Sequence, residues 1–112
     1  MALRLAPNVS LAKATPQIVI ALMVAVPVLE YYHSDLYVTS FDDGKHGEGT
    51  LHGKGRAFDF RIWYVEAVLR EAMIARLAQR LGPEFDVILE PDHGHVEWDP
   101  DYLKPGATAE KV

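Results

Sequence analysis

The segment Arg56-Ala57-Phe58-Asp59-Phe60-Arg61-Ile62 decides the fold, because its apolar and polar residues alternate with a period of two. Alternation of this kind is typical of a β-strand with one face on the core, since successive side chains point to opposite sides. The phenylalanines and the isoleucine then face the core, and Asp59 and Arg61 lie on the opposite face. The segment predicts a strand that packs on one side and carries chemistry on the other.

A second alternating segment, His93-Gly94-His95-Val96-Glu97-Trp98, follows a predicted strand over 85–89. Its two histidines and Glu97 share one face, while Val96 and Trp98 take the other. The short link between the two strands suits a hairpin. If the strand at 56–62 neighbours this one, the aspartate and the second histidine converge on one face of the sheet.

Helices are predicted on both sides of the first strand. Thr15-Pro16 combines an N-cap residue with proline in the first turn, so a helix begins there and bends or ends near Pro27 or shortly after, at Tyr31-Tyr32. A second helix over 64–81 stops at Gly82-Pro83. Its apolar residues at helical spacing are Val65, Val68, Leu69, Ala72, Met73 and Leu77.

The remaining segments complete a prediction of fold class. Residues 36–41 favour a strand, 1–14 form an N-terminal arm without a pattern, and 100–112 form a flexible tail. Trp63 and Trp98 are interpreted as structural residues. We expect a single domain over 1–112 of the α+β class, with a small antiparallel sheet and two main helices.

Composition excludes several classes of partner. A net charge of −5 without a basic cluster argues against nucleic acid. The most apolar run, Ile18 to Leu29, is interrupted by Pro27 and is shorter than the roughly 20 residues of a membrane span. We expect no stable membrane insertion, no clear signal peptide, synthesis in the cytoplasm and a monomer.

The absence of cysteine leaves histidine and carboxylates as the only strong metal ligands. His52 lies in the glycine-rich stretch that precedes Asp59, and His95 lies on the second alternating strand. Nitrogen and oxygen ligands in this ratio are those of a catalytic zinc ion with one position open for water. The same residue types are also common in solvated turns, so spacing alone leaves both interpretations open.

The two segments together resemble a known superfamily. Thr50-x-His52-x-x-Gly55-x-Ala57-x-Asp59, followed by Glu90-x-Asp92-His93-x-His95-x-Glu97, is similar to the zinc D-alanyl-D-alanine carboxypeptidase and hedgehog superfamily, in its small phage-associated branch. The similarity covers roughly residues 15–100. It implies a hedgehog/DD-peptidase-like fold, Zn²⁺ as cofactor, and His52, Asp59 and His95 as its ligands.

The resemblance also assigns catalytic candidates. Related peptidases carry a carboxylate three residues before the last histidine ligand, which implies Asp92 as general base, with Glu90 as the competitor. The alternative is that either carboxylate only stabilises the turn between the last two strands. His93 would stabilise the oxyanion, unless it is an ordinary surface histidine. Glu97 would orient His95.

Substrate contacts are expected from Ser40, His46 and Arg61, because a peptide stem with free carboxylates needs hydroxyl or cationic anchors. Arg61 shares the face of Asp59, so it either anchors a substrate carboxylate or neutralises that aspartate. The alternative for His46 is a plain turn residue.

The resemblance implies a zinc metallopeptidase that hydrolyses an amide bond in peptidoglycan peptide stems, as a D-Ala-D-Ala carboxypeptidase or an L-Ala-D-Glu-type endopeptidase. It would act on the bacterial cell wall, in a phage or prophage lysis role after phage-assisted release. The alternatives are a non-catalytic, zinc-stabilised binding module and a phage structural module of the same fold.

Overall fold

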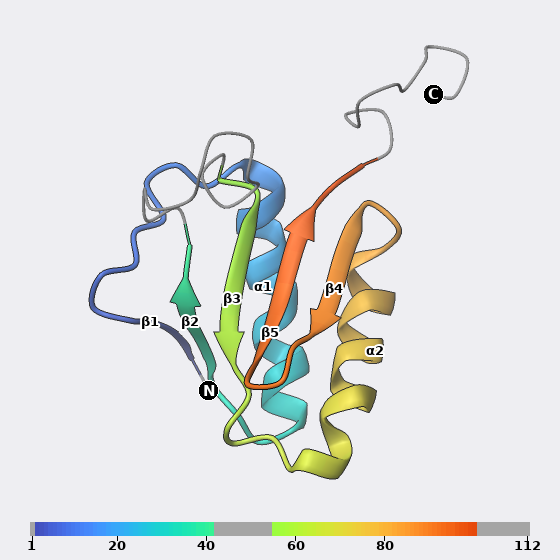
Figure 1. Cartoon of the computed structure of the whole chain (residues 1–112). Coiled ribbons are helices and arrows are strands. Elements are labelled where there is room, and N and C mark those ends of the chain that lie inside the picture. The colour runs from blue at the N-terminus through green and yellow to red at the C-terminus, as the bar shows by residue number, and fades with distance from the viewer. Residues whose placement is uncertain (1, 42–54, 101–112) are drawn as a thin grey trace.

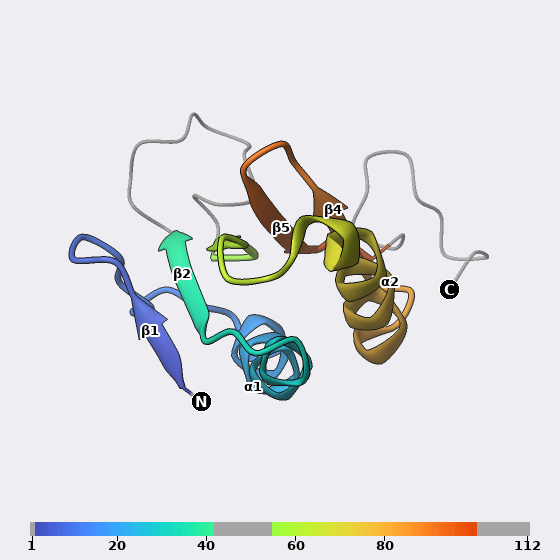
Figure 2. The same cartoon turned by 90° about the horizontal axis from the view of Figure 1, so that it is seen from below.

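The computed structural model describes residues 2–41 and 55–100, in which a five-stranded sheet carries two helices on one face (Figures 1 and 2). The strand order is β1-β2-β3-β5-β4. The strands are Leu3–Leu5 (β1), Leu36–Ser40 (β2), Ala57–Arg61 (β3), Phe85–Leu89 (β4) and His93–Trp98 (β5). The prediction of an α+β domain with two main helices is confirmed. The flexible tail predicted over 100–112 lies outside the described residues, apart from Pro100.

The sheet is mixed, whereas the sequence predicted an antiparallel one. β1 runs parallel to β2, with Leu3 beside Leu36 and Leu5 beside Val38, and the other three pairs are antiparallel. The arm predicted over 1–14 therefore contains an edge strand. Three residues are too few for a period of two to be recognised, so only the pairing with β2 defines β1.

The first helix, α1, spans Pro16–Tyr31 and begins as predicted. The hydroxyl of Thr15 accepts a hydrogen bond from the backbone N–H of Ile18 at 3.3 Å. The helix continues through Pro27 to the later of the two predicted ends. The side chains that it buries recur at helical spacing: Ile18, Ala21, Leu22, Ala25, Val28 and Leu29.

The second helix, α2, spans Arg70–Leu81 and follows a single 3-10 turn over Ala67–Leu69, so the predicted start at residue 64 was wrong. The N–H of Val65 donates to the carbonyl of Ile62 at 3.0 Å, in a turn that places the Val65 side chain in the core before the helix begins. Of the six apolar residues at the predicted spacing, Val65, Met73 and Leu77 are buried, whereas Val68 (85% exposed), Leu69 and Ala72 are exposed. Within residues 2–41 and 55–100, neither helix has the length and apolar character that crossing a membrane requires.

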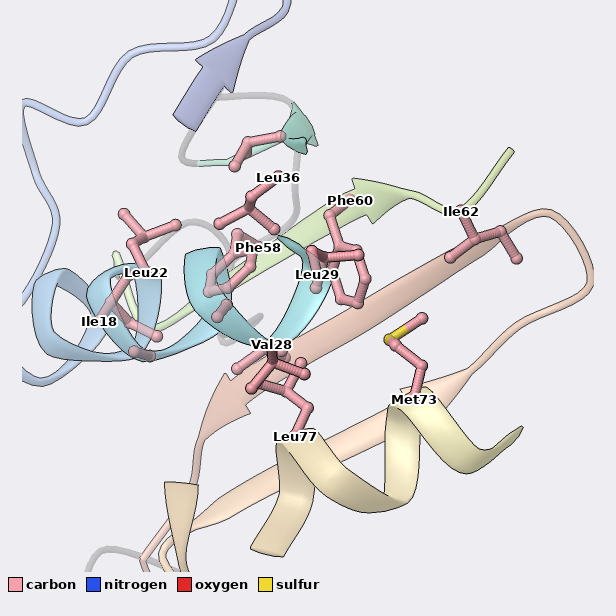
Figure 3. Packing of buried hydrophobic residues seen from close by; sticks show 14 of the residues in the cluster. Ile18, Leu22, Val28, Leu29, Leu36, Phe58, Phe60, Ile62, Met73 and Leu77 are labelled. Carbon is pink, nitrogen blue, oxygen red and sulfur yellow. The ribbon is translucent and has the colours of Figure 1, made fainter. Parts of the chain in front are cut away.

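The core lies between the sheet and the helices (Figure 3). Phe58 and Phe60 project from β3 toward α1 and α2, and both are fully buried, as the alternation predicted. Gly94 is the partner of Phe60 across the sheet, and a β-carbon on this glycine would overlap the phenylalanine ring. The glycine between the two histidines is thus required by the core, on the far side of the strand.

Candidate metal and catalytic site

The strands β3 and β5 bring Asp59 and His95 together on the face of the sheet that the helices leave uncovered. The two residues are direct cross-strand partners, and Oδ1 of the aspartate lies 2.6 Å from Nδ1 of the histidine. Their side chains are 20% and 17% exposed. The predicted convergence is confirmed. We call this side of the sheet, with Asp59, Arg61, His93, His95 and Glu97, the open face.

His95 is held between two carboxylates. Its Nε2 lies 2.7 Å from Oε1 of Glu97, which stands two residues further along the same strand and points the same way. The hydrogen bond to Asp59 is the main cause that raises the pKa of His95, with a further contribution from Glu97, while burial opposes both. The imidazole therefore keeps its proton to a higher pH than a free histidine does.

His93 forms a second pair with a carboxylate. Its Nδ1 donates to Oδ1 of Asp92 at 2.6 Å, and its Nε2 lies 3.7 Å from Oδ2 of Asp59. The hydrogen bond from His93 lowers the pKa of Asp92, whose side chain is 84% exposed. Asp92 thus holds Nδ1 of the His93 ring, and Nε2 of the same ring lies toward the half-buried Asp59.

A cavity of about 230 Å³ lies over this group, and six residues line it: Thr39, Asp59, Arg61, Trp63, Asp92 and His93. Of the two candidates for general base, Asp92 is in this cavity. Glu90 instead lines a separate hollow of about 690 Å³, with Ile62 and Glu71 among its neighbours. Asp92 therefore lines one cavity with Asp59, whereas Glu90 lines another.

The other predicted contacts fall at different places. Ser40 is the cross-strand partner of Asp59, beside an irregularity in the pairing of β2 with β3. The guanidinium carbon of Arg61 lies 3.9 Å from the centre of the Trp63 ring, and Trp63, which was interpreted as structural, is 64% exposed. His46 and the proposed ligand His52 lie outside the described residues.

Asp59 and His95 are residue types that bind zinc. Each ring nitrogen of His95 lies within hydrogen-bond distance of a carboxylate, Nδ1 of Asp59 and Nε2 of Glu97, so a zinc ion would have to replace the proton between Nδ1 and Asp59. A histidine ligand commonly donates its second N–H to a carboxylate, and this contact sets the tautomer and the orientation of the ring. Asp59 and His95 thus offer one oxygen and one nitrogen at a common point.

A second group of acids lies nearby, where Asp86, Glu97 and Asp99 have oxygens within 4.8 Å of one another. Its ligands are carboxylates alone, a set that suits hard cations better than zinc. Grouped surface acids are common without any ion, so we assign no site to it.

Trp98, predicted to pack in the core, is buried beside this group and donates from Nε1 to Glu84.

Two features of the site were not anticipated from the sequence. One is the contact of Gly94 with Phe60, for which the only signal is a glycine in an alternating strand. The other is the contact of Arg61 with Tyr37, which comes from the neighbouring strand β2.

Comparison with known proteins returned no match among family models, curated proteins or solved structures.

Proposed function

We propose that the protein is a zinc-dependent peptidase that hydrolyses an amide bond in bacterial peptidoglycan stems, with the hedgehog/DD-peptidase-like architecture that its two motifs resemble. The observation that carries the proposal is the pairing of Asp59 with His95 at 2.6 Å across β3 and β5. These are two of the three ligands that the resemblance implies. The third, His52, belongs to the glycine-rich segment that precedes β3.

Zinc, when bound, supplies a Lewis acid that makes water a better nucleophile and polarises a carbonyl. The protein's own residues hold and orient the components. Asp59 and His95 would bind the ion, and Glu97 would keep the His95 ring in the tautomer that leaves Nδ1 available. The removal of either ligand should therefore abolish binding without disturbing the core on the opposite face.

The geometry favours different roles for Asp92 and His93. A carboxylate with a lowered pKa is a weaker proton acceptor, and Asp92 already accepts the Nδ1–H of His93. We assign to Asp92 the positioning of the ring, and to Nε2 of His93 the transfer of a proton between attacking water and leaving amine. Hydrolysis adds water across the amide bond, so the amine must gain the proton that the water loses.

The test is to incubate the purified protein with muropeptides, with and without a chelator, and to identify products by mass spectrometry. Chelator-sensitive release of D-Ala would indicate a carboxypeptidase, and cleavage between L-Ala and D-Glu an endopeptidase. One zinc ion per chain without turnover would favour the non-catalytic binding module. A protein that binds no zinc would overturn the proposal.

Variants separate the roles. Asp59→Asn and His95→Gln should lose zinc, whereas His93→Gln should keep zinc and lose turnover. Asp92→Asn should keep zinc and retain more activity than His93→Gln, because it removes only the residue that positions the ring. The matched control is His33→Asn, at the end of α1, where φ is 64° and asparagine is well tolerated. If Asp92→Asn were the more damaging change, Asp92 would be the base.

A further inference from the structure

Arg61 is held between two aromatic rings on the open face. Its guanidinium carbon lies 4.0 Å from the centre of the Tyr37 ring and 3.9 Å from that of Trp63. Cation–π contacts of this kind use the faces of the rings and do not use the N–H groups of the guanidinium as hydrogen-bond donors. The side chain is therefore held in place without using its in-plane donors.

Those donors have no partner among the residues that the structure describes. Nε of Arg61 is buried without a hydrogen bond, and no ion pair joins this arginine to a described acid. A buried donor that lacks a partner is costly, so such a group in a cavity is a candidate for binding a ligand.

The position of Arg61 connects it to the proposed site. It is the cross-strand partner of His93, it stands two residues from Asp59 on the same strand, and it lines the same cavity of about 230 Å³. Both acids in that cavity are engaged by histidines, Asp59 by His95 and Asp92 by His93. The charge of Arg61 is left for a ligand.

We propose that Arg61, stacked between Tyr37 and Trp63, binds a free carboxylate of the peptide whose amide bond lies at the Asp59–His95 centre. A carboxylate matches the parallel N–H groups of a guanidinium, and two such hydrogen bonds fix direction as well as position. This inference rests on the proposed function for the choice of peptide, although not for the recognition of the carboxylate. It makes Arg61 the residue that selects substrates by charge.

Peptide binding, measured by calorimetry on chelator-treated protein, tests the recognition without turnover. The probe is a stem pentapeptide ending in D-Ala-D-Ala, compared with its C-terminal amide and with the peptide amidated on D-Glu. The wild type should prefer the free carboxylate by about 10- to 100-fold, as expected for hydrogen bonds to a charged group. The amidated peptide that binds more weakly than the free acid identifies which of the two carboxylates Arg61 binds.

Arg61→Met should lose that preference, and Arg61→Lys should keep only part of it, because lysine retains the charge without the planar pair of donors. Arg80→Met makes the same change at an exposed position on α2 and should leave the preference intact. If Arg61→Met does not fold, as judged by circular dichroism, the lysine variant decides.

The outcomes separate this inference from the proposed function. Equal binding of acid and amide by the wild type, no binding of either, or an equal loss for both in the Arg61 variants would overturn it. A preference for the carboxylate in a protein that hydrolyses nothing with zinc would uphold the carboxylate site and refute the peptidase.

Discussion

The two faces of the sheet differ in what holds their side chains. The covered face is apolar and packed by two helices, with Phe58 and Phe60 fully buried. The open face, on the same two strands, carries imidazoles and carboxylates joined by hydrogen bonds of 2.6 to 2.7 Å. Alternate residues of one strand face opposite sides, so a substitution on one face should change either stability or the proposed chemistry, with little effect on the other. Gly94 is the exception, because it lies between His93 and His95 and its α-carbon is packed against Phe60.

The largest expected effect is on the covered face. Phe58→Ala should lower the free energy of unfolding by about 3–5 kcal/mol, because it removes a buried ring and leaves a cavity. The measurement is chemical denaturation. Ile88→Ala is the matched change on the open side of β4, where the side chain is 41% exposed, and should cost about 0.5 kcal/mol or less. Equal losses in both would remove the distinction between the faces.

Gly94→Ala should cost about 1–3 kcal/mol, since the added methyl would overlap the Phe60 ring and force β3 and β5 to adjust. We also expect weaker zinc binding, because a shift between β3 and β5 would change the position of His95 relative to its cross-strand partner Asp59. A second substitution, Phe60→Leu, should recover part of the loss when added to Gly94→Ala. Strict additivity of the two changes in a double-mutant cycle would contradict this contact.

Thr15→Ala acts on the helix layer alone. Loss of the N-cap should lower the free energy of unfolding by about 1 kcal/mol. The zinc content and any turnover should stay unchanged, because the substitution keeps the backbone N–H of Thr15, which donates to the carbonyl of Gly55 ahead of β3 at 3.1 Å. A change in zinc affinity at unchanged folding would show that the layers are coupled.

The smallest effect concerns pH and sharpens the contrast between the faces. The pKa of His95 is raised above its ordinary 6.5 in the folded chain, first by Asp59. The resulting stabilisation of the metal-free protein is complete below the unfolded pKa and is lost as pH rises through the folded one. With chelator present, the stability difference between wild type and His95→Gln should be larger near about pH 6 than near about pH 9. The loss in Phe58→Ala should be similar at both, and a pH-independent His95→Gln difference would contradict the assignment.

Most of the strands were predictable because their pattern is local. The period of two placed Phe60 on one side and Asp59 on the other, and the same logic sorted His95 from Val96. The start of α2 was not predictable, because the turn that buries Val65 depends on the core that receives it. Nor was β1, whose three residues carry no pattern of their own.

For the site, the sequence alone determined the residue types and the strand face on which each one lies, since side-chain alternation is a property of the backbone. Only the tertiary structure decided that β3 neighbours β5 in the register that pairs Asp59 with His95. It also decided that Asp92, rather than Glu90, lines a cavity with Asp59, and that the ring of Tyr37 from another strand lies against Arg61. These contacts join residues far apart in the chain, and only the packing of the whole sheet against its helices determines which strands meet.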